Sequence, residues 1–333
     1  MRSILLGIFE LRRYRRGPLG RAAVVAMVLL PLLYGCVYLV AFWNPYNNLS
    51  ALPVAVVNQD QPVTASGKQV DVGNQLTTTL VNGKQFDWTV TDAATASSGA
   101  RASFMSAASP GVISLFFRDD HYGNQEKYLY AIAEAMRHEY ETVANAGIIL
   151  QIDCPDLGMG RHIQYADLSI AEFRKKAQLH IEALNHALAN IPADRLRLHL
   201  CWGNYEGPHH YDVALADIID VVLRAKPAGL SLEAANPRHA HEFTVFESVK
   251  LPAGKVLIPG VLESKTNFIE HPELVAQRIA RYANLVGREN VIAGTDCGYG
   301  TWVGQAAVDP DIVWAKFAAM AEGARIASRQ FWK

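Results

Sequence analysis

The sequence has few cysteines and almost no net charge, and these absences exclude several classes of protein. The four cysteines, Cys36, Cys154, Cys201 and Cys297, are too few and too widely spaced for a disulfide framework. No Cys-x-x-Cys pair is present, so the chain has no dithiol redox motif. The formal net charge is −1, and no basic stretch recurs outside the first twenty residues, so nucleic acid is not an expected partner.

The first residues differ sharply in composition from the rest of the chain. Residues 1–21 are rich in arginine, whereas residues 22–43 contain no charged side chain. An apolar run of this length allows a helix to cross a hydrocarbon core of ~30 Å, and it exceeds the ~7–15 apolar residues of a signal peptide. We therefore predict a retained transmembrane helix over residues 22–43 that attaches the chain to a membrane, with residues 1–21 on the cytoplasmic side.

A small β-rich segment is predicted over residues 44–98. Pro53–Val57 and Phe86–Val90 have the β-branched and aromatic composition of strands, and Asn58–Pro62 is typical of a turn. Small residues then dominate the sequence, and we place the junction with the rest of the chain at residues 99–102.

Several motifs of this front part occur together in one known family. They are Arg12-Arg-Tyr14, the apolar run through Tyr34 and Tyr38, Trp43-Asn-Pro45, and Leu52–Asn58 followed by Asp60 and Pro62. With these motifs, roughly the first hundred residues resemble the start of the YhgE/Pip family of export-related membrane proteins. The resemblance implies a membrane-bound front part.

Beyond the junction, short apolar runs of strand length alternate with amphipathic helical patterns. Ser169 to Glu172 forms a capping box that predicts a helix start, and Pro272 suits the first turn of a later helix. This alternation predicts a parallel sheet with helical crossovers, which fits both a barrel and an open doubly wound sheet. No glycine-rich phosphate loop follows a strand, which disfavours nucleotide binding. The six predicted strands lie at 104–108, 147–152, 196–201, 229–233, 255–261 and 290–294.

Candidate metal ligands gather at the C-terminal ends of these strands. His199 and Cys201 end one strand, and Glu233 ends the next. Asp153 follows an earlier strand, and Cys297 follows the last one. Residues two apart on a strand point to the same face, so His199 and Cys201 can reach one ion. Two thiolates, an imidazole and a carboxylate at the rim where barrel enzymes carry their active sites predict a Zn²⁺ site.

Six motifs beyond the junction occur in the order of a second known family. They are Ser109-Pro-Gly111, Leu150–Asp156, Leu198–Gly203, Leu230–Glu233, Pro259–Leu262 and Gly294–Gly298. This set, spanning about 230 residues, resembles the C-terminal barrel of cobalamin-independent methionine synthase, especially its shorter methionine synthase II-like relatives. The resemblance implies class α/β, with an incomplete TIM (β/α)8-type barrel over residues 103–333 after the transmembrane helix and the small β-rich segment.

The resemblance also implies a ligand set and a reaction. It matches the four zinc ligands to His199, Cys201, Glu233 and Cys297. Asp153 matches the aspartate that holds the amino group of homocysteine. The implied reaction is methyl transfer from methyl-folate to homocysteine, in which zinc stabilises the thiolate of a thiol whose free pKa is ~8.5. No cobalamin is required.

One position departs from the family's pattern. Lys265 stands where the family has its catalytic histidine, and we predict that Lys265 acts near the departing methyl donor. Three histidines in loops, His209, His210 and His271, are other candidate acids. Related zinc enzymes alkylate coenzyme M with epoxides, so the sequence leaves both the thiol acceptor and the alkyl donor open.

The barrel part is shorter than the resemblance implies. Two strands and their helices are expected before Ser103, so we predict an open remnant of six strands with two exposed sheet edges. The transmembrane helix would deliver this part outside the cell, whereas the barrel's relatives are cytoplasmic. An alternative hypothesis is therefore a fusion of the front of one gene to the back of another, which is anchored in the membrane and catalytically inert.

Overall fold

The structure is a computed structural model that describes most of the chain beyond residue 101 and parts of residues 53–90. Described are residues 53–56, 63–65, 68–71, 74, 77–78, 81–82, 87–90, 102–300 and 308–332. The basic segment 1–21, the predicted transmembrane helix 22–43 and the predicted turn Asn58–Pro62 lie outside these residues. Of the helices that fall within them, none has both the length and the apolar character needed to cross a bilayer. The predicted domain boundaries therefore stay predictions.

The front part of the described chain forms two small sheets. Strand β1 (Pro53–Val56) pairs in parallel with β4 (Asp87–Val90). Strand β2 (Val63–Ala65) pairs antiparallel with β3 (Lys68–Val70). The two strands predicted in this segment are thus confirmed within one residue at each end, while the hairpin β2–β3 was not predicted.

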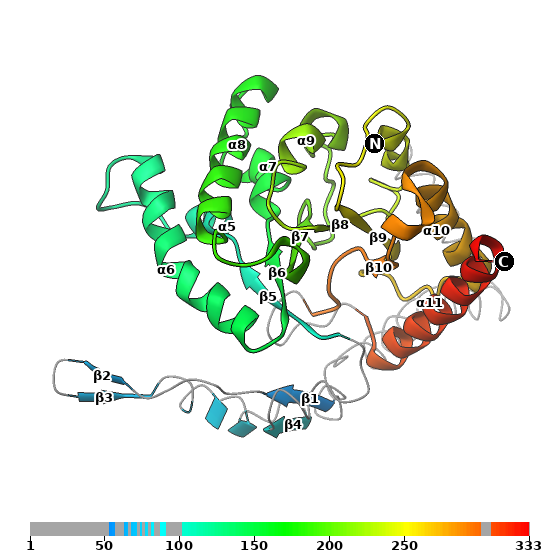
Figure 1. Ribbon diagram of the computed structural model, residues 1–333, viewed down its shortest axis with the longest axis horizontal. Helices are drawn as coiled ribbons and strands as arrows, with labels where there is room; N and C mark the ends of the chain where they lie inside the picture. Colours follow the sequence, from blue (N-terminus) through cyan, green and yellow to red (C-terminus); the bar gives the residue numbers. More distant parts are fainter. Residues whose placement is uncertain are drawn as a thin grey trace, which may run out of the picture. The chain divides into compact units, whose positions relative to one another are not determined.

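The remaining described residues build a six-stranded parallel sheet with helical crossovers (Figure 1). Its order, β10-β9-β8-β7-β6-β5, follows the chain, so each strand pairs with its sequence neighbour. The result is a half-barrel of class α/β, consistent with a partial TIM barrel. The strands are β5 (Phe104–Ala108), β6 (Ile149–Asp153), β7 (Leu196–Leu200), β8 (Gly229–Leu232), β9 (Val256–Leu262) and β10 (Gly294–Thr295).

Helices connect the strands along the outside of this sheet (Figure 1). The α-helices are α5 (Pro110–Phe116), α6 (Gln125–Asn145), α7 (Gly160–Ile163), α8 (Ile170–Ala187), α9 (Leu215–Val222), α10 (Pro272–Val286) and α11 (Pro310–Phe331). Four 3-10 helices are η2 (Pro155–Leu157), η3 (Ala193–Arg195), η4 (Glu242–Glu247) and η5 (Arg288–Asn290).

The predicted helix signals are confirmed. Ser169 and Glu172 form both hydrogen bonds of a capping box at the start of α8. Pro272 occupies the first turn of α10, where its missing N–H group costs nothing. Gly147 follows the end of α6 with a φ of 81°, a conformation that glycine adopts without strain.

Alternation along the strands separates an apolar face from a polar face. Leu150 and Ile152 of β6 are fully buried in the main hydrophobic core, together with residues of α6 and α8. Gln151 and Asp153 alternate with them and so lie on the opposite face of the sheet. The same alternation on β7 puts His199 on that opposite face. The polar residues of the strands therefore collect inside the half-barrel.

The last predicted strand, at residues 290–294, is wrong in its position. Asn290 ends the 3-10 helix η5, and Val291 makes only an isolated bridge to Leu257. The paired residues are Gly294 and Thr295, with a register shift between them. Such an irregularity bends a strand.

The two ends of the six-stranded sheet are the edges predicted from the sequence. Strand β5 is one edge, and its Phe104 and Met105 are 52% and 51% exposed. Strand β10 is the other edge, and it consists of only two residues. Within the part of the chain that the structure describes, neither strand has a second partner.

Candidate metal centre

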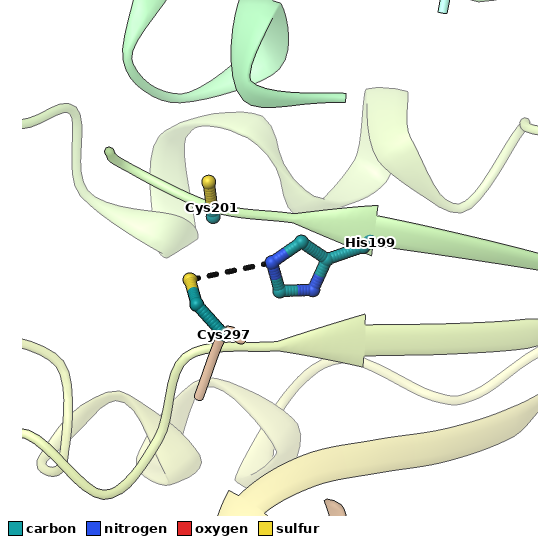
Figure 2. Close-up of side chains that lie close together, drawn as sticks. All are labelled: His199, Cys201 and Cys297. Atoms are coloured by element: carbon teal, nitrogen blue, oxygen red, sulfur yellow. Dashed lines mark hydrogen bonds between the residues drawn. The ribbon is translucent and has the colours of Figure 1, made fainter. Parts of the chain in front are cut away.

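Three predicted ligands converge at the C-terminal end of the half-barrel. His199 lies in β7 and Cys201 follows that strand, so the spacing of two residues puts both side chains on one face. Cys297 follows β10 and joins them from the far end of the sheet. One ligand atom of each residue lies within 4.8 Å of the others, and all three residues are buried. Figure 2 shows the three side chains, with His199 Nε2 3.4 Å from Cys297 Sγ.

The distances and atom types fit a zinc ion. Tetrahedral zinc with Zn–S bonds of ~2.3 Å and Zn–N bonds of ~2.0 Å holds its ligand atoms about 3.5–3.8 Å apart. The separation of 3.4 Å between His199 Nε2 and Cys297 Sγ agrees with that geometry. Two sulfurs and one imidazole nitrogen are also the donors that this borderline-soft cation prefers. His199, Cys201 and Cys297 therefore form a group that can hold a metal.

Glu233, the fourth predicted ligand, directly follows β8 but does not belong to this group. Its carboxylate is 2% exposed and accepts hydrogen bonds from three donors. These donors are the Trp202 backbone N–H at 2.9 Å, Asn236 Nδ2 at 2.7 Å and Arg238 Nη2 at 3.2 Å. The role of Glu233 as a ligand stays a prediction.

The three ligands change one another's pKa values when no metal is bound. Interaction with Cys297 lowers the pKa of the Cys201 thiol, and the same interaction raises the pKa of Cys297. Burial opposes a charged imidazole, but the neighbouring Cys201 sulfur outweighs burial and raises the pKa of His199 to about 9. The raised pKa values of His199 and Cys297 favour a proton on both residues when no metal is bound.

Zinc affinity should rise with pH between about 6 and 9, because zinc must displace the protons on His199 and Cys297. The pKa of His199 is raised, so its proton opposes zinc throughout this window and ceases to do so above pH 9. For each proton that zinc displaces, the apparent association constant of zinc should rise ~10-fold per pH unit. Chelator competition at several pH values measures the slope, and an affinity independent of pH would contradict the assigned protonation.

Asp153 lies beside the metal group on the neighbouring strand. It ends β6 and is in register with His199 of β7. Its Oδ1 atom is buried without a hydrogen-bond partner among the described residues. Burial, followed by the charge of Cys201, raises the pKa of Asp153 to about 6, so the carboxyl is mostly ionised at pH 7. A carboxylate with one buried, unpaired oxygen is suited to receive a cationic group from a ligand.

Lys265 lies in the loop that follows β9. Its backbone N–H donates to both carboxylate oxygens of Glu263, each at 2.9 Å. Burial lowers the pKa of the Lys265 amine, and the charges of Cys297 and Arg238 also act on it. The Lys265 amine therefore lies within electrostatic range of the metal group. In that place an ammonium group can donate a proton to a bound molecule.

A fully buried lysine, Lys316 of α11, anchors the Lys265 loop. Its ammonium donates to the Glu263 carbonyl at 3.1 Å and to Glu270 Oε2 at 2.9 Å. The other oxygen of Glu270 accepts the Glu263 backbone N–H at 2.8 Å. One buried ion pair therefore holds both ends of the loop.

The substitution Lys316→Met should lower the free energy of unfolding by about 3–5 kcal/mol, because it leaves the Glu270 carboxylate buried without its nearest cation. Adding Glu270→Gln should recover part of that loss, since the uncompensated charge is then removed as well. Urea denaturation measures both. A change below about 1 kcal/mol would show that the pair does not anchor the loop.

The three candidate histidines lie in different surroundings, and none belongs to the metal group. His209 is buried, with one ring nitrogen 3.0 Å from Asp212 Oδ2 and the other 3.1 Å from the Tyr205 carbonyl. His271 caps the N-terminus of α10. His210 is exposed and lies against Tyr211.

One residue of the centre escaped the sequence analysis. Asp296 is 1% exposed, and its carboxylate accepts backbone N–H groups of Ala234, Ala235 and Asn236 at 2.7–2.8 Å. It thereby ties the segment that precedes Cys297 to the loop that follows Glu233. Its position directly before the predicted ligand Cys297 was the one sequence feature that could have drawn attention to Asp296. Nothing in the sequence indicated which groups it contacts.

Together, the half-barrel and the buried His/Cys/Cys group define an α/β barrel-type protein with a group that can hold a metal ion. Residues 109–318 match the protein family described as "Cobalamin-independent synthase, Catalytic domain". The chain belongs to this family.

Different relatives match the two parts of the chain that the sequence analysis distinguished. Methionine synthase of Thermococcus kodakarensis is 26% identical over 222 residues, which cover 66% of this chain and 56% of that protein. The uncharacterized protein YhgE of Bacillus subtilis is 40% identical over 65 residues, which cover 20% of this chain and 8% of that protein. The predicted resemblances of both ends are thus confirmed, and the chain spans only about half of the methionine synthase.

A solved structure supports the fold. It is a B12-independent methionine synthase from Shewanella sp. W3-18-1, determined in complex with selenomethionine. The TM-score is 0.54 at 19% identity, with 68% of this chain and 62% of that chain covered. At this identity the likeness concerns the fold alone.

Proposed function

We propose that the chain is a zinc-dependent S-methyltransferase that transfers the methyl group of a methyl-folate to homocysteine, as in methionine biosynthesis. The observation that carries the proposal is the buried group of His199, Cys201 and Cys297 at one rim of the half-barrel. A zinc ion bound there would act as a Lewis acid and lower the pKa of a coordinated thiol from ~8.5 toward neutrality.

Asp153 would hold the ammonium group of homocysteine. Its Oδ1 atom is buried and unpaired, and its strand position is in register with His199, so a bound amino acid thiol can reach both residues. The substitution Asp153→Asn should weaken binding of homocysteine about 10–100-fold, the cost of losing a charged partner for a buried ammonium. Calorimetry on the zinc-loaded protein measures it, with 4-mercaptobutyrate, which has no amine, as the control that should bind equally to both forms.

Lys265 would deliver the proton that the departing nitrogen of the methyl donor needs. The attacking sulfur takes the methyl group, the carbon–nitrogen bond breaks, and the freed nitrogen accepts a proton from the lysine ammonium. The lowered pKa of Lys265 makes that ammonium a better acid.

The direct test is an assay of the full chain, purified with its N-terminal part in detergent and loaded with zinc. Homocysteine and a methyl-folate polyglutamate should yield methionine and demethylated folate in equal amounts. A zinc-loaded, folded protein that forms no methionine would contradict the proposal.

A second acceptor, coenzyme M with an epoxide as alkyl donor, remains the alternative within the same chemistry. Coenzyme M has a sulfonate and no ammonium, so it would leave the buried Oδ1 of Asp153 unpaired. That unpaired oxygen favours homocysteine. Parallel assays with both thiols decide between them.

We also propose that residues 22–43 attach the chain to a membrane. Support comes from the uncharged run itself and from the arginines that precede it. Release of the full chain from membranes by alkaline carbonate would contradict this. Zinc-free, membrane-bound protein without transferase activity would instead support the inert fusion considered above.

A further inference from the structure

His199 presents its two ring nitrogens to different neighbours. Nε2 lies 3.4 Å from Cys297 Sγ and so faces the metal group, whereas Nδ1 lies 3.2 Å from the hydroxyl oxygen of Ser231. Ser231 is 6% exposed. A neutral imidazole that binds a metal through Nε2 carries its proton on Nδ1. In that state Nδ1–H donates to Ser231 Oγ, which can accept because a hydroxyl both donates and accepts.

The sheet fixes this contact independently of any metal. His199 of β7 and Ser231 of β8 are paired residues in neighbouring strands. Leu230 and Leu232, on either side of Ser231, belong to the hydrophobic core on the other face of the sheet, so Ser231 points into the half-barrel as His199 does. Nδ1 and Nε2 lie on different edges of the imidazole ring, so a metal on Nε2 leaves the contact with Ser231 in place.

The partner of His199 is uncharged, and this bears on the chemistry of a bound zinc ion. A carboxylate in the place of Ser231 would also orient the ring, but it would make the imidazole a stronger donor. Two thiolates, Cys201 and Cys297, already balance the two positive charges of a zinc ion. A further negative group behind His199 would oppose an incoming thiolate. A hydroxyl partner therefore suits a centre that must accept another sulfur anion.

We propose that Ser231 is a positioning residue of the metal centre: its hydroxyl turns Nε2 of His199 toward the metal and, being uncharged, keeps a bound zinc ion able to accept a substrate thiolate. Ser231 acts through His199 rather than on the substrate. The part of this inference that concerns thiols rests on the proposed function, whereas the part that concerns zinc affinity does not.

The test compares Ser231→Ala, Ser231→Thr and Ser231→Asp in the full chain. Zinc affinity is measured by competition with a chromophoric chelator. Thiol affinity is measured with 2-mercaptoethanol on the cobalt(II)-substituted protein, from the sulfur-to-cobalt charge-transfer band. Ser114→Ala is the matched control, because Ser114 is also 6% exposed but donates to the Gly111 carbonyl in α5.

The three substitutions should differ in sign. Ser231→Ala should lower zinc affinity ~10–100-fold, the usual cost of losing a residue that hydrogen-bonds to a metal's ligand. Ser231→Thr should bind zinc as the unmodified chain does, because it keeps the hydroxyl at a strand position that suits a β-branched residue. Ser231→Asp should raise zinc affinity about 10-fold, since a carboxylate makes His199 a stronger donor. The same variant should lower thiol affinity about 10-fold, because its charge opposes a further thiolate.

Opposite effects of Ser231→Ala and Ser231→Asp distinguish positioning through His199 from a packing role, which would weaken zinc binding in both variants. Equal zinc affinities of Ser231→Ala and Ser114→Ala would overturn the proposal, and so would a Ser231→Thr variant that binds zinc as weakly as Ser231→Ala. A loss of zinc affinity in Ser231→Asp would also overturn it, and that variant decides the matter if Ser231→Ala does not fold.

The thiol measurement tests the role of charge. Unchanged thiol affinity in Ser231→Asp would contradict the part of the proposal that assigns the uncharged partner a role in accepting the thiolate. If 2-mercaptoethanol gives no charge-transfer band with any form, the proposed function fails, and the zinc affinities still decide whether Ser231 positions His199.

Discussion

Cys297→Ser should abolish high-affinity zinc binding and methyl transfer together. Cys297 is one of three side chains that converge, and it follows a strand that is distant in sequence from His199 and Cys201. Removing a residue that only hydrogen-bonds to a zinc ligand lowers zinc affinity ~10–100-fold. Removing a thiolate ligand itself should therefore lower zinc affinity more than about 100-fold. Zinc analysis after dialysis against a weak chelator, together with a methionine assay, measures both effects.

Cys154→Ser is the matched control for that substitution. Cys154 is also buried, but it does not belong to the group that can hold a metal. The control should keep about one zinc per chain. Equal zinc content in the Cys297 and Cys154 variants would mean that the thiol at 297 is not a ligand.

Lys265→Met should lower turnover about 10²–10⁴-fold while zinc content and homocysteine affinity stay unchanged, the range over which general acids act. The ammonium form is the active one, and burial lowers its pKa. The rate of the unmodified chain should therefore fall as pH rises through that lowered pKa. The variant should lose this alkaline limb, because it has no proton to lose.

The exposed Lys250 provides the comparison for Lys265. Lys250→Met removes the same charge from a loop outside the centre and should leave the rate and its pH profile as they are. A Lys265 variant that retains the alkaline limb would assign that limb to another group, and a variant with full turnover would remove Lys265 from the reaction.

The sequence was sufficient wherever a signal is local or periodic. The alternation of strand and helix gave the α/β class, and the capping box at Ser169 gave the start of α8. His199 and Cys201 were predicted to share an ion because residues two apart on a strand point the same way. Cys297 was harder, since it lies 98 positions from His199, and it was found through the C-terminal ends of the strands and the family resemblance.

What the sequence did not reveal depends on contacts across long separations. Nothing local to Asp296 indicates that it accepts three backbone N–H groups some 60 positions away. The partners of Glu233 were missed for the opposite reason. Asn236 and Arg238 are close to it in sequence, but a turn with Asn-Pro-Arg looks like any solvated loop until its burial is known.

The irregular strand β10 shows a third limit. Its apolar residues predicted a strand at 290–294, but strand position depends on register, and a shift between Gly294 and Thr295 displaces the pairing toward Cys297. Register is set by neighbours rather than by composition. The displacement matters, because it ends the strand two residues before a ligand.

X-ray absorption at the zinc edge of the purified full chain tests the central claim most directly. The account predicts one zinc per chain with two sulfur neighbours at ~2.3 Å and an imidazole nitrogen at ~2.0 Å, the remaining position being filled by a light atom. A zinc-free protein after growth with ample zinc, or a zinc shell made of oxygen and nitrogen alone, would contradict it.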